Sequence, residues 1–244
     1  MPNPTAAMLT IGDEILSGRT QDTNMPHLAR ALVEKGIALR ETRVVPDVAE
    51  EIIAAVNALR ARYTHVFTSG GIGPTHDDIT ADSVAAAFGV GIDVREDARA
   101  LLASNYANPE VELNPARLRM ARIPDGATLI VNAVSKAPGF SLGNVHVMAG
   151  VPSVFHAMVA ALLPGLEGGA PMLSGTLRVD HPEGKVAGPL KAVAEAHPGV
   201  SIGSYPFSEE GRHGTNLVAR TEDAGALDAA MADLRAMTAR LGEA

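Results

Sequence analysis

A glycine-rich turn followed by two aspartates is the pattern in this sequence that is most typical of a chemical site. Gly70-Gly71-Ile72-Gly73-Pro74 follows a short apolar run, and Thr75, Asp77 and Asp78 come directly after it. Glycines let a ligand approach the backbone closely, and amide groups at the start of a following helix offer an anion site. Carboxylates beside a phosphate repel it unless a hard cation such as Mg²⁺ lies between them. The pattern therefore predicts a metal-bridged phosphoanhydride.

The members of this pattern have separate expected roles. The expected phosphate contacts are Gly70, Gly71, Gly73 and Thr75, and the expected metal ligands are Asp77 and Asp78. Asp78 could instead cap the following helix, but a cap does not need the like charge of Asp77 beside it. The eight histidines show no metal-ligand spacing, so a zinc site is not expected.

Two further polar segments follow apolar runs in the same way. Gly12 to Thr23, which carries Asp13, Glu14 and Ser17, comes after the first run. Asp47 comes after the second, where a capping box with Glu50 explains its position as well as a role in the site does. Serine chemistry is not expected, because neither Ser17 nor Ser153 has a visible histidine partner.

The elements expected around these segments alternate between strand and helix. Apolar runs predict strands at 6–11, 37–45 and 63–68, and a helix capped by Asn24 ends at Gly36. Such β-α-β-α-β alternation is typical of a parallel sheet covered by helices, whose ligands bind beyond the carboxyl ends of the strands. We therefore expect the three polar segments to meet at one edge of a three-layer α/β/α domain.

The rest of the chain is expected to complete this domain and add a small one. Helices are predicted to Gly89, over 96–107 and over 154–163, a loop over 108–114, and strands over 128–131, 140–142 and 145–148. Gly150 begins a second glycine turn at the same edge. The Gly- and Pro-rich segment near 164–171 separates residues 1–167 from a β-α-β-β-α domain at 172–244. Its last helix carries a core stripe of Leu227, Met231, Leu234 and Leu241.

Composition and charge limit the possible partners. The chain has 244 residues, 46% of them hydrophobic and 20% charged, as in a folded globular protein. It has no cysteine, which excludes disulfides and thiolate metal sites. A net charge of -8 opposes broad binding to nucleic acid or anionic membranes. Without a targeting or membrane-spanning pattern, a cytoplasmic location is expected.

The motifs together resemble the MoaB/Mog molybdopterin-binding domain family, in the form found in the N-terminal part of CinA-type competence/damage-inducible proteins. The motifs are Gly12-Asp13-Glu14-Ile15-Leu16-Ser17-Gly18 with Thr23-Asn24, Val45-Pro46-Asp47, Gly70 to Thr75 with Asp77-Asp78, and Gly150-Val151-Pro152-Ser153. The tail is similar to the small KH-type domain that follows in CinA. Nothing in the sequence resembles the CinA amidase domain, so deamidation of nicotinamide mononucleotide is not expected.

The resemblance implies a set of site residues. The functional acidic positions of the family fall on Asp47 and Asp78, which would be catalytic. The remaining expected substrate contacts are Asp13, Ser17, Asn24, Lys136, Gly150 and Ser153. Several positions differ from the usual CinA pattern: Ala149 replaces a proline, Asp22 an asparagine, Ser135-Lys136 a Gly-Thr pair, and Val154-Phe155 a Glu-Met pair. Lys136 thereby becomes a possible cation for a phosphate.

The resemblance leaves three functions open. CinA-type domains are similar to Mg²⁺-dependent pyrophosphatases, so hydrolysis of a nucleotide diphosphate such as ADP-ribose or FAD is the first expectation. Mog-type relatives bind and adenylylate molybdopterin, which is the second. The third is a nucleotide-binding module without catalysis. In each case we expect a small nucleotide or pterin ligand and a homo-oligomer, either a dimer or a trimer.

Overall fold

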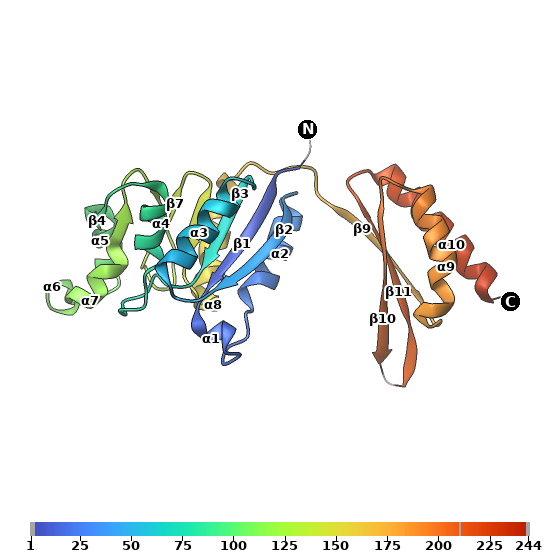
Figure 1. Cartoon of the computed structure of the whole chain (residues 1–244), viewed down its shortest axis with the longest axis horizontal. Helices are drawn as coiled ribbons and strands as arrows, with labels where there is room; N and C mark the ends of the chain where they lie inside the picture. Colours follow the sequence, from blue (N-terminus) through green and yellow to red (C-terminus); the bar gives the residue numbers. More distant parts are fainter. Residues whose placement is uncertain (1–2, 210, 243–244) are drawn as a thin grey trace. The chain divides into compact units, whose positions relative to one another are not determined.

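The chain folds into two compact units, which are described separately. The structure is a computed structural model that describes residues 3–209 and 211–242. The units comprise Met1–Gly169 and Ala170–Ala244, and Figure 1 shows their secondary structure. Each unit has a sheet and a hydrophobic core of its own.

The first unit is built on a six-stranded, mostly parallel sheet with the strand order β2-β1-β3-β8-β7-β6. Its parallel strands are β1 (Thr5–Ile11), β2 (Ala38–Val45), β3 (His65–Ser69) and β8 (Val145–Met148). β7 (Gly139–Leu142) runs antiparallel to β8, and β6 (Thr128–Ile130) antiparallel to β7. The predicted parallel α/β architecture is confirmed.

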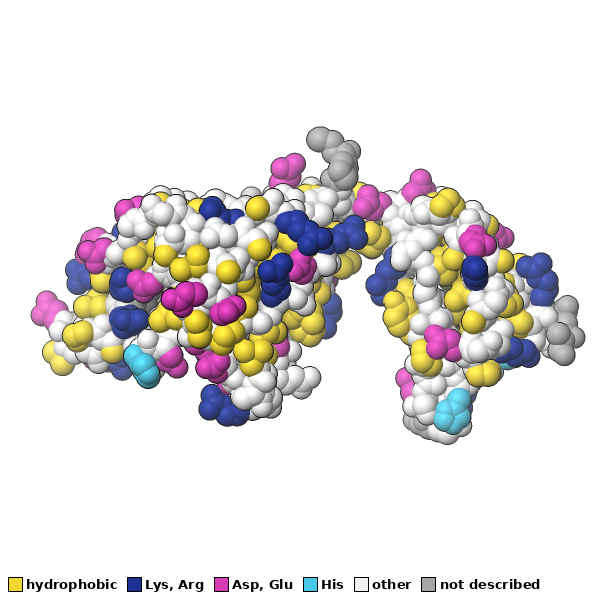
Figure 2. All heavy atoms as spheres, in the orientation of Figure 1, with side chains coloured by type: hydrophobic (Ala, Val, Ile, Leu, Met, Phe, Trp, Pro, Cys, Tyr) yellow, Lys and Arg dark blue, Asp and Glu magenta, His cyan; other side chains and the backbone are white. Residues whose placement is uncertain are grey.

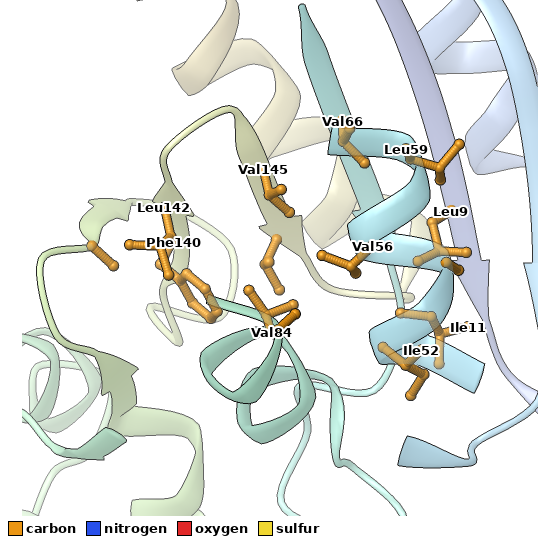
Figure 3. Close-up of a cluster of buried hydrophobic side chains, with 14 of the residues drawn as sticks. Leu9, Ile11, Ile52, Val56, Leu59, Val66, Val84, Phe140, Leu142 and Val145 are labelled. Carbon is orange, nitrogen blue, oxygen red and sulfur yellow. The ribbon is translucent and has the colours of Figure 1, made fainter. Parts of the chain in front are cut away.

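Helices cover both faces of this sheet and make the three layers (Figure 1). α2 (Asn24–Glu34) and α8 (Pro152–Leu162) pack on one face, in a core that includes Met8, Phe67 and Phe155. α3 (Ala49–Arg60) and α4 (Thr80–Phe88) pack on the other face, against Leu9, Val66 and Val145 (Figure 3). Successive strand residues point to opposite faces, so central strands covered on both sides are apolar throughout.

Short elements lie outside the predicted set. They are α1 (Asp13–Leu16), β4 (Ile92–Val94), α6 (Pro109–Glu112), β5 (Arg122–Pro124) and η2 (Leu163–Gly165). Helical structure is expected from the sequence at α5 (Glu96–Ala103) and around Leu118 and Met120, where α7 (Pro115–Leu118) and η1 (Arg119–Ala121) lie. The helix expected to reach residue 107 ends at Ala103, and the loop expected over 108–114 contains α6, because Pro109 favours the first position of a new helical turn. β4 and β5 form a separate antiparallel pair.

The second unit has the predicted β-α-β-β-α order. It contains β9 (Leu173–Val179), α9 (Glu183–Ala196), β10 (Ser201–Glu209), β11 (Arg212–Thr221) and α10 (Ala224–Gly242). The antiparallel sheet has the order β10-β11-β9, and Met231 and Leu234 of α10 lie in its core, with Leu227 and Leu241 packed against it. The core role predicted for this stripe is confirmed.

Two features of the surface bear on the classes of partner. Acidic and basic side chains are interspersed over the visible face of the first unit, which presents no single large basic patch in this view (Figure 2). Within residues 3–209 and 211–242, no helix combines the length and the apolar character needed to cross a membrane.

Candidate functional site

Four parallel strands end side by side and position the predicted site. Val45 of β2 is paired with Ile11 of β1, Thr10 of β1 with Ser69 of β3, and Ser69 with Met148 of β8. The loops that follow begin at Gly12, Pro46, Gly70 and Ala149. The chain runs from β1 outward to β2 and then back across β1 to β3, so the order reverses between β1 and β3, where open sheets of this type bind ligands.

The first glycine turn brings the backbone of three loops into close contact. Gly70 has φ +110, and a side chain there would collide with the carbonyl oxygen of Ile11. Gly71 has φ +68 and lies against the hydroxyl of Thr80, whose amide donates to the Gly71 carbonyl at 2.9 Å. A Cβ atom at Gly150 would lie 3.3 Å from the Gly70 Cα. At positions 70 and 71, only a glycine can be accommodated without strain.

Asp78 faces the glycine turn, as predicted. Its Oδ2 accepts hydrogen bonds from the amide of Thr75 at 2.8 Å and from the Thr75 hydroxyl at 2.6 Å. A Cβ atom at Gly73 would lie 2.6 Å from the same carboxylate. α4 begins only at Thr80 and has no side-chain cap, so capping of this helix does not explain Asp78. Asp77 is exposed, and the polar groups near it, first the Thr75 side chain and then its own backbone amide, lower its pKa.

Asp47 lies beside the loop that follows β1. Its Oδ2 accepts the amide hydrogen of Asp13 at 3.0 Å. The capping box with Glu50 is not formed, because α3 begins at Ala49 after Val48 and has no side-chain cap. Burial raises the pKa of Asp47, and the negative charges of Asp13, Glu14 and Asp77 raise it further, against the hydrogen bond from Asp13. Asp13 and Asp77 are therefore near enough to Asp47 to repel its negative charge, and these three aspartates are called the acidic cluster.

Asn24 has a different role from the predicted helix cap. Asp22 caps α2 instead, because its Oδ1 accepts the amide hydrogens of Asn24 at 2.8 Å and Met25 at 3.2 Å. The buried Asn24 side chain donates to the Ser69 hydroxyl at 2.8 Å and to the Gly150 carbonyl at 2.7 Å. Asn24 thus ties the end of β3 to the second glycine turn, and both of its amide hydrogens are used inside the protein.

The other expected contacts are less closely tied to the aspartates. Ser17 is exposed and donates to the Glu14 carbonyl at 3.3 Å. Lys136, with φ +60, lies in the loop after β6, which leaves the sheet at the same edge as β8. Ser153 is exposed in the first turn of α8. Within residues 3–209 and 211–242, none of these three side chains hydrogen-bonds to Asp13, Asp47, Asp77 or Asp78.

Sequence reasoning missed a cation beside Asp78. Arg119 of η1 donates from Nη2 to the Asp78 carbonyl oxygen at 3.2 Å. It lines a narrow pocket with Gly73 and Asp78. Three arginines within six residues, at 117, 119 and 122, were the available signal. The position of Arg119 near the glycine turn depends on a contact 41 residues away along the chain.

The carboxylates fit a metal that binds together with its substrate. No group of three or more His, Cys, Asp or Glu side chains in the described ranges 3–209 and 211–242 is arranged to hold a metal ion. Mg²⁺ commonly binds to one or two carboxylates and completes its octahedron with waters and substrate phosphates. Asp77 and Asp78 directly follow the glycine turn and offer two carboxylates, so their chemistry is compatible with Mg²⁺ that binds together with a phosphate-bearing substrate.

Comparison with families of known proteins identifies both units. Residues 7–168 match the family described as "Probable molybdopterin binding domain", and residues 171–241 match the "FAD synthase, middle domain". The first match spans most of the first unit, including all four loops at the site edge.

Individual relatives agree with this assignment. A protein of Aeropyrum pernix is 35% identical over 217 residues, which cover 85% of this chain and 81% of that protein. A CinA-like protein of Desulfosudis oleivorans is 34% identical over 209 residues, covering 81% of this chain and 51% of that protein. A CinA-like protein of Citrifermentans bemidjiense is 38% identical over 167 residues, covering 66% and 40%. The chain thus spans about half or less of these CinA-like relatives.

A solved structure shows the same fold. The protein CinA of Thermoplasma acidophilum, described as of unknown function, superimposes with a TM-score of 0.61 at 35% identity, over 66% of this chain and 97% of that chain. The resemblance inferred from the sequence motifs is confirmed. The chain belongs to the molybdopterin-binding domain family of the MoaB/Mog type and has CinA-like proteins among its relatives.

Proposed function

We propose that the first unit binds a nucleotide diphosphate at the carboxyl edge of its sheet and hydrolyses the phosphoanhydride with the help of Mg²⁺. The observation that carries this proposal is the pairing of Thr75 with Asp78 directly beside Gly73, at the same edge as the Asp13–Asp47 pair. Phosphate-binding backbone and metal-binding carboxylates are thereby available to one ligand.

The side chains have distinct roles in this proposal. Asp77 and Asp78 would hold Mg²⁺, which supplies charge neutralisation of the diphosphate and lowers the pKa of bound water. The turn from Gly70 to Thr75 orients the phosphate oxygens through backbone groups. Asp47 accepts a proton from the attacking water, and burial favours this role because it raises the pKa of Asp47 towards the working pH.

Two of the comparisons support different substrates. The match of residues 171–241 to the FAD synthase middle domain supports a dinucleotide such as FAD or ADP-ribose. The match of residues 7–168 to the molybdopterin-binding family supports the second candidate, binding and adenylylation of molybdopterin. Adenylylation would use the same diphosphate-binding turn, because the adenylyl donor is also a phosphoanhydride.

A product analysis distinguishes these functions. Purified full chain is incubated with Mg²⁺ and, separately, ADP-ribose, FAD, ATP and ATP with molybdopterin. Pyrophosphatase activity yields AMP and ribose 5-phosphate from ADP-ribose, or AMP and FMN from FAD. Adenylyl transfer yields adenylylated molybdopterin and pyrophosphate from ATP. Stabilisation by a nucleotide without any product would contradict both reactions and favour a binding module.

The catalytic assignment is tested with Asp78→Asn. Loss of one charge from the metal-binding pair is expected to lower the hydrolysis rate at least about 100-fold, a size typical of lost electrostatic stabilisation in an active site. The matched control is Asp93→Asn, an exposed aspartate in the separate β4–β5 pair, which should hydrolyse at the original rate. An unchanged rate in folded Asp78→Asn would remove Asp78 from the mechanism.

A further inference from the structure

Arg119 lacks the carboxylate partner that three of its neighbouring arginines have. Arg95 pairs with Asp97 at 2.7 Å, Arg99 with Glu96 at 2.8 Å, and Arg122 with Asp82 at 2.7 Å. Arg119 is half-buried and makes no ion pair within residues 3–209 and 211–242. The other unpaired neighbour, Arg117, stacks on Tyr106 at 4.8 Å.

The donors of Arg119 are only partly satisfied. Nη2 donates to the Asp78 carbonyl, but Nε is buried and has no hydrogen-bond partner among the described residues. A guanidinium that is partly withdrawn from water needs a counter-charge or full hydrogen bonding to offset its desolvation. Nothing in the part of the chain that the structure describes supplies either. The side chain is therefore suited to an anionic ligand.

The pocket next to Arg119 places such a ligand beside the proposed site. Gly73 and Asp78 line it from one side, and Met120, Ile123 and Phe140 are among its apolar walls. Of the described residues that line this pocket, none belongs to the acidic cluster of Asp13, Asp47 and Asp77. Asp82 and Arg122, which pair with each other, also line it, so Arg119 is the cation of this pocket that has no carboxylate partner among the described residues.

We propose that Arg119 is a substrate-positioning residue that binds the phosphate group of the diphosphate that is not held by the metal at Asp77 and Asp78. This inference rests on the proposed function and adds the orientation of the diphosphate. One phosphate is held with the metal, and the other is held by Arg119. A ligand with two linked phosphates can contact both the metal and the Arg119 guanidinium, whereas a single phosphate can contact only one of them. The substrate class is therefore a diphosphate and not a phosphomonoester.

Inorganic pyrophosphate is the probe that tests this role. Its binding to the full chain is measured by calorimetry in the presence of Mg²⁺, for the original protein and for Arg119→Gln, Arg119→Lys and Arg117→Gln. We expect Kd to rise at least about tenfold in Arg119→Gln, as for a lost hydrogen-bonded charge pair. We expect a smaller rise in Arg119→Lys, which keeps the charge, and no change in Arg117→Gln, which loses the same charge two residues away.

The salt dependence of pyrophosphate binding distinguishes two roles of Arg119. One is attraction of the phosphate by its charge, and the other is support of the loop through the hydrogen bond to the Asp78 carbonyl. Binding to Arg119→Gln should weaken less with added NaCl than binding to the original protein, because one screened interaction is missing. Equal losses in the Gln and Lys variants with an unchanged salt dependence would show that Arg119 only braces the loop. Unchanged affinity in Arg119→Gln while ADP-ribose is still hydrolysed would overturn this inference alone. Failure of the original protein to bind pyrophosphate and to hydrolyse any dinucleotide would overturn the proposed function as well.

Discussion

At the scale of single residues, the glycine turn shows that glycine can be required at a position for two reasons, a positive φ angle and a lack of room for a Cβ atom. Gly71 and Gly89 have the same φ of +68, which costs a non-glycine residue roughly 1 kcal/mol or more. A Cβ atom at Gly89 would meet nothing within 4 Å, whereas at Gly71 it would collide with Thr80. The two positions separate conformational strain from steric overlap.

Gly71→Ala is therefore expected to be more destabilising than Gly89→Ala. Both variants carry the backbone strain, and Gly71→Ala adds an overlap that costs about 1–3 kcal/mol more. Chemical denaturation of the first unit measures both. Thr80→Ala in the Gly71→Ala background should recover part of the difference, since the buried Thr80 hydroxyl has no hydrogen-bond partner among the described residues. Equal losses at Gly71 and Gly89 would contradict the overlap.

At the scale of elements, a chain of largely buried polar side chains crosses the neighbouring strands β3, β8 and β7. His65 Nδ1 lies 3.3 Å from His146 Nε2, and the Ser141 hydroxyl lies 2.8 Å from His146 Nδ1. Burial lowers the pKa of His146 to about 4, with a further contribution from His65, and burial also lowers the pKa of His65. These strands therefore fold with neutral histidines.

The first unit is expected to lose stability as the pH falls from about 6.5 to about 4. A histidine whose folded pKa is below its unfolded value stabilises the fold fully above the unfolded pKa and loses that contribution as the pH falls towards the folded one. For His146 the full effect is roughly 3 kcal/mol. Urea unfolding across this window measures it. His146→Gln should flatten the dependence, and His213→Gln in the second unit should leave it unchanged; a steep dependence retained in His146→Gln would contradict the assignment.

The sequence predicted elements well and contacts between elements less well. The parallel strands, both glycine turns and the position of Asp78 followed from local apolar runs and glycine spacing. The capping role given to Asn24 was wrong, and of the two readings left open for Asp47 the capping one does not hold. The side chains of Asn24 and Asp47 bond instead to Ser69, Gly150 and Asp13, which only the fold brings near. Arg119 and the β4–β5 pair were missed for the same reason, since distant pairing leaves no local periodicity.

At the scale of the whole molecule, each unit buries its own core. The first unit has apolar clusters on both faces of its sheet, and the second packs α9 and α10 on a separate sheet. All four loops of the proposed site belong to the first unit. Hydrogen bonds from Gly169 to Lys35 and from Lys35 to Pro164 keep its final segment attached.

Residues 1–169 and 170–244 are therefore expected to fold when they are produced separately. Each has a self-contained core, which is the usual requirement for an independent domain. Cooperative thermal unfolding and dispersed amide NMR spectra of each piece measure this, and the first piece should retain pyrophosphate binding. An unfolded first piece that is rescued by adding the second would show that its core is incomplete alone.

The backbone contacts among Ile11, Gly70 and Gly150 limit how this fold can acquire new specificities. A Cβ atom at Gly70 would collide with the Ile11 carbonyl oxygen, so no side chain can be introduced at Gly70 to recognise a different ligand, and one at Gly150 would crowd the Gly70 backbone. Diversification of substrate choice within this architecture must come from the surrounding segments, at 12–23 and 131–138, whose lengths and sequences can vary without separating the strands. Engineering of altered selectivity would begin with those two loops.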